Sequence, residues 1–258
     1  MQSTADPDRQ APAVATAILI FAALSLIAAV TSDGFLEADG CTHYLYARYA
    51  LLEPHYFVNV WGRPFWTALY CIPGFFGGRL GVRVMSLAVA ISIALIAWQI
   101  AKKQNWPWPV LAMIFTFAQP LFFLHSFSEL TELPFALLLG LAFWAYQSKQ
   151  FFWMTVIIAV TPLSRPEGFA FLGLAALALL LHRRWWWLVL LPIPLLLWNY
   201  AGWRVYGRPG NWWQWQYPWL VWLKTNWPYA QKSLYQPGPI WHFIVLLPVV
   251  VPLYVPLV

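Results

Sequence analysis

The sequence predicts an all-α fold, a polytopic transmembrane bundle of about eight helical spans that forms a single domain over residues 1–258. Composition carries this prediction. The chain is 61% hydrophobic and only 9% charged, whereas a soluble domain is roughly 25% charged. The deficit extends along the whole chain and leaves no polar surface to face water. Apolar runs also recur near the length of about 20 residues that crosses a bilayer.

The apolar runs give the positions of the spans. They fall at 11–30, 81–101, 107–127, 131–147, 151–164, 168–182, 185–203 and 240–258. Prolines interrupt several runs, which membrane helices tolerate where neighbouring helices or water satisfy the freed carbonyl groups. Glycines and prolines break up the segment 59–83, so we expect a short interfacial helix there. The run 240–258 has no basic cap, and we expect the chain to be incomplete at its C-terminus.

Basic residues orient these spans. The positive-inside rule assigns three basic turns and the N-terminus to the cytoplasm. The turns carry Lys102, Lys103, Lys149, His182, Arg183 and Arg184. We therefore expect an integral protein of the cytoplasmic (inner) membrane, with its active face periplasmic or extracellular. The net charge of +6 is scattered in ones and twos, which fits topology signals and anionic lipid headgroups rather than a nucleic-acid partner.

Acidic residues mark the opposite face. Apart from two in the N-terminal tail, every Asp and Glu falls in an outer loop when the spans are oriented in this way. These residues are Asp33, Glu37, Asp39, Glu53, Glu129, Glu132 and Glu167. Separate loops would not agree in this way by random placement. The sequence therefore predicts a charged, mixed-sign site above an apolar bundle.

The first outer loop, GFLEADGCTHYLYARYALLEPHYF, holds the most concentrated group of charges. We expect an amphipathic helix ended by Pro54 and capped by Asp39 or Thr42, with His43 on the same face as Asp39. A capping Asp beside a solvated Glu37 is the ordinary structural interpretation. The functional alternative is an acid pair at the membrane surface that deprotonates an acceptor delivered from water.

Two more outer turns contain charged groups. In HSFSELTELP, Glu129 and Glu132 either favour the dipole of a helix capped by Ser128 or Thr131, or orient a sugar or an arginine. Arg165, in the turn TPLSRPEGF, needs a partner near the membrane edge.

Arg165 has two open assignments. It either pairs with one of the glutamates Glu129, Glu132 and Glu167 or binds a lipid phosphate. We expect Arg63, Arg79 and Arg83 to act mainly as snorkelling anchors near the headgroups.

Four motifs in this order resemble a known family. The acidic motif LEADG after the first span, followed by WGRP, TELPFALLL and SRPEGF, is similar to bacterial GT-C membrane glycosyltransferases. The likeness is greatest to the protein-mannosyltransferase-like and aminoarabinose-transferase-like branch, and in layout it covers nearly the whole chain. It implies an inverting enzyme that moves a hexose-type sugar from a polyprenyl-phosphate donor to an acceptor hydroxyl. Family members have more spans and a soluble C-terminal part.

The resemblance also implies roles for individual residues. The general base is Asp39 first and Glu37 second; the family has an adjacent Asp-Glu pair, whereas Ala38 separates the two acids here. The other roles follow from the chemistry of the residues rather than from the resemblance. Arg165, helped by Arg48 or Arg63, can steady the charge of the departing phosphate. Glu129, Glu132, Glu167 and His43 are expected to orient the substrate.

Other functions stay open at this stage. The chain could be a transporter or flippase of lipid-linked or polar substrates, although ionisable residues gathered at one surface favour surface chemistry. It could also be an inactive truncated homologue. The partners expected are the lipid-linked donor and membrane lipids. No cofactor is firmly implied, and Glu37 and Asp39 holding a divalent cation is the less favoured option.

Overall fold

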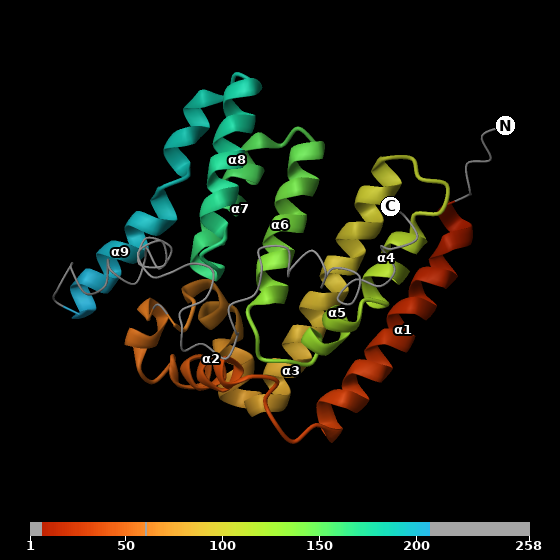
Figure 1. Ribbon diagram of the computed structural model, residues 1–258, viewed down its shortest axis with the longest axis horizontal. Helices are drawn as coiled ribbons and strands as arrows, with labels where there is room; N and C mark the ends of the chain where they lie inside the picture. Colours follow the sequence, from red (N-terminus) through yellow and green to blue (C-terminus); the bar gives the residue numbers. More distant parts are fainter. Residues whose placement is uncertain (1–6, 60, 207–258) are drawn as a thin grey trace, which may run out of the picture.

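The structure, a computed structural model, describes residues 7–59 and 61–206, and every regular element in these residues is helical (Figure 1). The all-α prediction is confirmed for this part of the chain. The elements are α1 (Pro7–Thr31), α2 (Ala38–Tyr49), η1 (Pro54–Val58), α3 (Pro64–Lys103), α4 (Val110–Phe117), α5 (Pro120–His125), α6 (Glu132–Gln147), α7 (Phe151–Ser164), α8 (Gly168–Leu181), η2 (Trp185–Leu190) and α9 (Ile193–Tyr206). The span predicted at 240–258 lies outside the described residues.

Among the described residues, three helical stretches are long and apolar enough to cross a membrane: Gln10–Thr31, Pro64–Lys103 and Trp185–Tyr206. The other predicted spans correspond to shorter helices. The run 107–127 is not one helix, because Ala118 and Gln119 separate α4 from α5 and Pro120 opens the second helix. The run 185–203 begins as the 3₁₀ helix η2 and becomes α-helical only in α9.

Helix α3 covers 40 residues in two helical parts, and the second part, 79–103, is long enough to cross a hydrocarbon core of about 30 Å. It contains a break at Gly78, whose φ of 58° and ψ of −147° are not helical. The part before the break lies with α2 across one end of the bundle, and the part after it runs the length of the bundle (Figure 1). The structure thus separates 64–77 from the long pass, as the predicted break-up of 59–83 requires.

The break also demands a second glycine. The chain folds back so closely that a Cβ atom on Gly81 would lie 2.2 Å from the carbonyl oxygen of Pro73. Pro73 has no N–H to bond to the Leu69 carbonyl, and Gly81 provides the space that the Pro73 carbonyl occupies.

Buried small residues let the long helices pack. Ala90 and Ala94 of α3 are fully buried, the first against α1 and α6 and the second against α1 and α4. A separate core joins α6, α7 and α8 through Ala145, Ile158 and Leu179. Helix α2 packs on α3 through Ala47, Trp66 and Tyr70, which fixes the first loop above the bundle.

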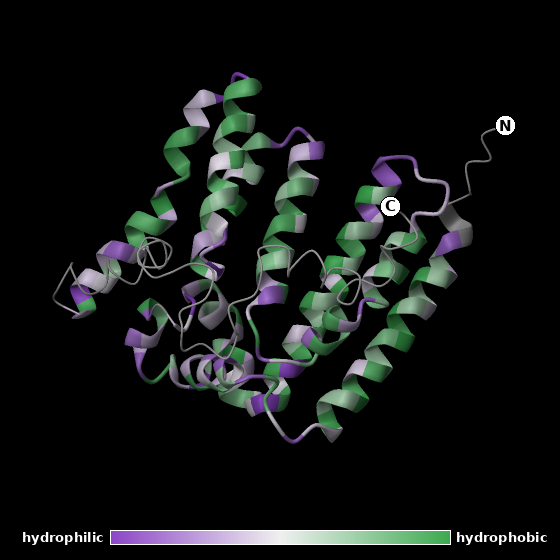
Figure 2. Cartoon of the chain, viewed as in Figure 1, coloured by the Kyte–Doolittle hydropathy of each residue, from purple (hydrophilic) through white to green (hydrophobic). Residues whose placement is uncertain are grey.

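Hydrophilic residues gather at both ends of the bundle (Figure 2), but the two ends carry different charged residues. We call one the acidic end. Its turns carry Asp33, Glu37, Asp39, Glu53, Glu129, Glu132 and Glu167. We call the other the basic end. Its turns follow α3, α6 and α8 and carry Lys102, Lys103, Lys149, His182, Arg183 and Arg184.

The helices α3, α6 and α8 end at the basic end in the same way. Each is followed by a non-glycine residue in the left-handed region: Asn105 (φ 58°), Lys149 (φ 57°) and Arg183 (φ 55°). The next amide then bonds back five residues, with distances of 3.1 Å (Trp106 to Ala101), 2.9 Å (Gln150 to Ala145) and 2.7 Å (Arg184 to Leu179). These bonds satisfy helix-terminal carbonyls in the manner of a Schellman motif and stop each helix sharply.

Candidate functional site

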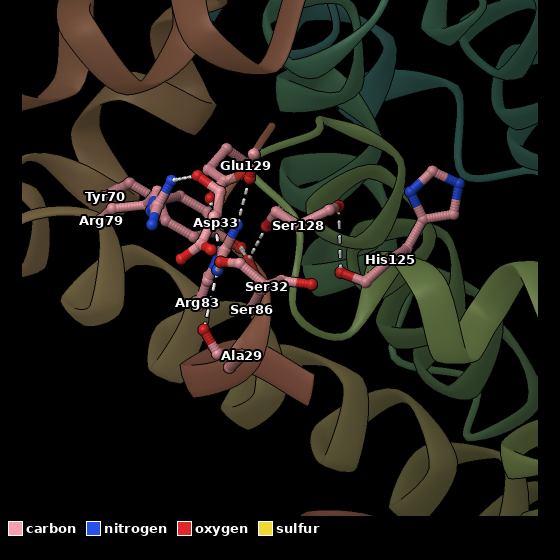
Figure 3. Close-up of polar contacts among 11 residues, drawn as sticks. Ala29, Ser32, Asp33, Tyr70, Arg79, Arg83, Ser86, His125, Ser128 and Glu129 are labelled. Carbon is pink, nitrogen blue, oxygen red and sulfur yellow. Dashed lines mark hydrogen bonds and ion pairs between the residues drawn. The ribbon is translucent and has the colours of Figure 1, made fainter. Parts of the chain in front are cut away.

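The loop between α5 and α6, residues 126–131, forms the floor of the acidic end. Ser126 Oγ lies 2.8 Å from Ser25 Oγ of α1, and both side chains are fully buried. The hydroxyl of Ser86 donates to the Ser128 carbonyl over 2.7 Å, as Figure 3 shows. The Trp66 indole donates to the Leu130 carbonyl over 3.0 Å. Helices α1 and α3 therefore hold this loop at several successive residues.

Arg83 and Glu129 form a buried ion pair in this floor (Figure 3). Arg83 Nε donates to Glu129 Oε1 over 2.8 Å, and the two side chains are 3% and 0% exposed. The other guanidinium nitrogens of Arg83 donate to the carbonyls of Ala29 and Ser32, both at 2.7 Å, and of Gly34, at 2.6 Å. The prediction of Arg83 as a snorkelling anchor is therefore wrong, because its charge is used inside the protein.

Glu129 lies directly under the first turn of α2. A Cβ atom on Gly40 would be 3.7 Å from Glu129 Cβ, so only a small residue lets the helix rest there. Burial raises the pKa of Glu129, and the bond and charge of Arg83 offset only part of this effect. Its second oxygen, Oε2, is buried and meets no hydrogen-bond partner within the described residues.

Arg165 lies in the turn between α7 and α8 and is bound by two carboxylates. It donates to Glu132, and to Glu167 over 2.9 Å, but not to Glu129. Thr131, at the N-cap of α6, makes no capping bond with its side chain and instead accepts a hydrogen bond from Arg165 over 3.0 Å. Burial alone would lower the pKa of Arg165, but Glu167 and Glu132 outweigh it and raise the pKa.

A close backbone contact fixes the turn that carries Arg165. A Cβ atom on Gly168 would lie 2.4 Å from the Pro162 nitrogen and 2.7 Å from the Thr161 oxygen. We expect Gly168→Ala to displace the start of α8 and to lower the melting temperature of the purified protein. Gly173→Ala, on the same helix with nothing within 4 Å of the added atom, is the matched control and should be neutral or slightly stabilising. Equal melting temperatures for the two variants would contradict this contact.

Helix α2 begins differently from the prediction. Glu37 occupies the N-cap position, makes no side-chain capping bond, and is exposed. Asp39 is an exposed first-turn residue, and the Thr42 hydroxyl bonds back to the Ala38 carbonyl over 3.4 Å. The prediction that Asp39 or Thr42 caps this helix is therefore wrong, and the Asp39 carboxylate remains available at the surface.

His43 lies one turn below Asp39 and is only 5% exposed. Its ring centroid is 5.4 Å from that of Trp66. Its ring feels the charges of four residues, which are Arg63, Asp39, Glu132 and Arg165. Charged groups from separate turns therefore lie near the same imidazole. Burial, and next the charge of Arg63, lower the pKa of His43 to about 4, so the ring is neutral at pH 7.

Arg63 is the cation of this group that has no carboxylate partner among the described residues. It precedes α3 with a φ of 53°, a strained conformation for a non-glycine residue, and its guanidinium lies 5.9 Å from the centre of the Trp61 ring. Burial, followed by the charge of Arg165, lowers its pKa. The charges of Glu167, Asp39 and Glu132 also act on it.

Arg48 is not brought to this group. It lies on α2 about 180° around the helix from Asp39, where it donates to the Tyr44 hydroxyl. Of the three arginines predicted to bind phosphate, the structure gathers Arg63 and Arg165 near Asp39 and leaves Arg48 on the other face of the helix.

His125 and Ser164 also belong to this part of the acidic end, although neither was predicted as a site residue. His125 ends α5, and the charges of Glu132 and Glu37 act on its ring, which links Glu37 to the same neighbourhood. Ser164 immediately precedes Arg165 and is fully buried. The signal available was their position inside HSFSELTELP and TPLSRPEGF, the turns that carry the glutamates and Arg165.

Besides Glu129 Oε2, four buried polar atoms at the acidic end make no hydrogen bond to any described residue. They are His43 Nδ1, His125 Nδ1, Glu132 Oε2 and Ser164 Oγ. Buried polar atoms are ordinarily hydrogen-bonded, and those left without a protein partner point to water, an ion or a ligand. Their gathering beside Asp39, Arg63 and Arg165 marks this part of the acidic end as a candidate site for a polar, hydroxyl-rich molecule.

The depressed pKa of His43 gives a pH prediction. In the unfolded chain the imidazole takes up a proton near pH 6.5, whereas the folded protein resists protonation down to about pH 4. Its contribution to stability is complete above pH 6.5 and is lost as the pH falls, by up to about 3 kcal/mol. The melting temperature of His43→Phe should therefore fall by less than that of the wild type when the pH is lowered from 7 to 5. Parallel curves for the two proteins would contradict a buried neutral ring.

No protein-family model, curated protein or solved structure matches the chain. The geometry of the site is therefore the basis for its interpretation.

Cys41 and Cys71 are free thiols, so they form no disulfide with each other.

Proposed function

We propose that the chain is a GT-C type membrane glycosyltransferase that moves a hexose-type sugar from a polyprenyl-phosphate donor to an acceptor hydroxyl. The observation that carries the proposal is the gathering of Glu37, Asp39, Arg63, Glu132 and Arg165 at one end of an apolar bundle, beside unpartnered buried polar atoms. These groups come from separate turns and provide a base, a cation and hydrogen-bonding atoms. They lie at one end rather than at mid-depth, as a reaction at the membrane surface requires.

The proposed reaction needs two charged groups. Asp39, or Glu37 in its place, takes the proton of the acceptor hydroxyl as the acceptor oxygen bonds to the anomeric carbon. The bond from that carbon to the phosphate oxygen breaks on the opposite side, with inversion, and polyprenyl phosphate leaves. Arg63 meets the charge that develops on the phosphate because no described carboxylate neutralises it.

Arg165 has a different part in this proposal. Since Glu132 and Glu167 already bind it, it holds these carboxylates in place to orient sugar hydroxyls. A phosphate oxygen reaching Arg165 would have to compete with both. Among the three arginines expected to bind the donor phosphate, Arg63 is therefore the primary ligand.

The lipid tail has a suitable place. An apolar groove of about 730 Å³ runs between α1 and the broken pair α4 and α5, lined by residues such as Ile20, Leu24, Phe117 and Phe123. Phe123 is two residues before His125 of the candidate site, so a tail in the groove would leave its phosphate near the acidic end. The break between α4 and α5 opens this side of the bundle.

We also propose the predicted topology of about eight spans. The shorter helices α6, α7 and α8, and the broken pair α4 and α5 as one span, would then cross the inner membrane alongside the three longer stretches, with the span 240–258 added. The N-terminus would be cytoplasmic and the acidic end periplasmic or extracellular, with α2 and the first part of α3 at the interface.

The test is a transfer assay in liposomes that contain the protein and a radiolabelled polyprenyl-phosphate hexose. The proposal expects label to move from the lipid fraction to an added hydroxyl acceptor. Movement of intact labelled lipid between leaflets, without transfer, would support the flippase alternative. If no acceptor in a panel receives label and the labelled lipid does not move between leaflets, the chain is an inactive homologue.

A further inference from the structure

The basic end carries a surplus of positive charge with no described carboxylate to balance it. Its permanent cations are Lys102, Lys103, Lys149, Arg183 and Arg184. None of them forms an ion pair with a described Asp or Glu, and the three turns that carry them contain no acidic residue. The arginines at the other end instead lie among acidic residues, so we expect the basic end to meet its counter-charge outside the protein.

The three basic turns form one surface rather than separate sites. Lys103 Nζ donates to Ser148 Oγ over 2.6 Å, which ties the turn after α3 to the turn after α6. The Tyr146 hydroxyl lies 3.1 Å from His182 Nε2, which ties α6 to the turn after α8. The left-handed conformations of Lys149 and Arg183 stop their helices at this surface, so both cations lie at the end of the bundle.

Tryptophans surround the same surface. Eight tryptophans are exposed in the described part of the chain, and six of them lie at the basic end, whereas Trp61 and Trp203 do not. The six are Trp106, Trp108, Trp144, Trp153, Trp185 and Trp186. Lys102 Nζ is 4.7 Å from the centre of the Trp98 ring, and Arg184 is 5.6 Å from that of Trp186. Tryptophan is enriched where a bilayer meets water, the depth at which lipid phosphates lie.

We propose that the basic end is a binding surface for the phosphate groups of anionic phospholipids. The five cations provide the charge, and the tryptophans place that charge at the depth of the lipid headgroups. Headgroup phosphates are already present at that depth, so they rather than free phosphate ions are the expected ligand. Basic clusters beside membrane helices attract anionic lipids in this way. This interaction is separate from the proposed sugar transfer, because it uses the opposite end of the bundle.

A simpler interpretation gives a different expectation. Basic residues at the C-terminal end of a helix also offset its dipole, which stabilises the protein equally in any lipid. Binding of anionic headgroups instead requires a preference for anionic over zwitterionic lipid, and one that weakens in high salt.

The test uses the tryptophans as reporters. The purified chain is titrated in mixed micelles with brominated phosphatidylglycerol or brominated phosphatidylcholine, and quenching of tryptophan fluorescence gives their relative affinities. We expect phosphatidylglycerol to bind more tightly. The variant Lys149→Gln/Arg183→Gln should lose about 30-fold of that preference, from the contribution of two cations at an anionic surface. Lys102, Lys103 and Arg184 remain to orient the chain.

The matched control removes the same net charge from the other end. Arg48→Gln/Arg204→Gln replaces two exposed arginines and should keep the full preference for phosphatidylglycerol. Equal binding of the two lipids by the wild type, or an equal loss in both variants, would overturn the proposal. Competition by millimolar inorganic phosphate would overturn it as well, since the site would then be one for free phosphate.

Discussion

Asp39→Asn is expected to lower the rate of sugar transfer by about 10²- to 10⁴-fold, the usual contribution of a general base. Asn keeps the size of the side chain but cannot accept the acceptor proton. Because Asp39 makes no capping bond in the structure, the change should leave the helix α2 and the melting temperature nearly unaffected. The measurement is initial transfer rate in liposomes at saturating donor.

Two further variants make this prediction specific. Glu37→Gln should have the smaller effect if Asp39 is the base, and the larger one if the roles are reversed. Glu53→Gln is the control, because Glu53 is an acid at the same end whose only described ion-pair contact is His55 at 3.6 Å. Wild-type rates in both Asp39→Asn and Glu37→Gln would rule out the proposed chemistry while leaving the fold intact.

Arg83→Met is expected to destabilise the protein by about 3–5 kcal/mol, the cost of removing one member of a buried ion pair. The loss has two parts. Glu129 remains buried without its partner, and the carbonyls of Ala29, Ser32 and Gly34 lose their common donor. The end of α1 and the approach to Glu37 then lose three of their bonds to α3, while the bond from Arg79 to the Asp33 carbonyl remains.

Glu129→Gln provides the matched comparison. Glutamine offers a neutral oxygen to Arg83 Nε and leaves the three carbonyl bonds of Arg83 in place, so we expect a cost of only about 1–3 kcal/mol. Melting temperatures in detergent, or resistance to unfolding by dodecyl sulfate, would measure both variants. Equal damage from the two changes would mean that the carbonyl contacts of Arg83 contribute little.

The sequence was a good guide to where helices lie, because long apolar runs and the prolines and basic pairs between them are local signals. The helices α6, α7 and α8 fall within a few residues of the runs that predicted them. The break at Ala118 and Gln119 was missed, since hydropathy stays high through it and only Pro120 marks it. Within residues 7–59 and 61–206, three long stretches rather than the seven predicted there satisfy the length that defines a crossing.

Partner choice was harder to predict than position. Arg83 bonds to backbone carbonyls about 50 residues earlier in the chain, and a carbonyl has no sequence signature. Arg165 had three candidate glutamates. Glu132 is the first residue of α6, and its side chain faces Arg165. Glu129 precedes the helix in an irregular segment, where helical spacing does not predict which way a side chain points. Such contacts depend on tertiary packing, so the sequence could list the charged groups but not pair them.

The separation of charge between the two ends has a consequence for an energised membrane. In the proposed orientation, the basic end lies on the electrically negative side and the acidic end on the positive side. Each charge moved through a potential of 100 mV changes the energy by about 2.3 kcal/mol, so voltage itself would oppose inversion of the bundle. A proton that leaves the acceptor at Asp39 would be released on the positive side, and sugar transfer would then draw nothing from the proton gradient.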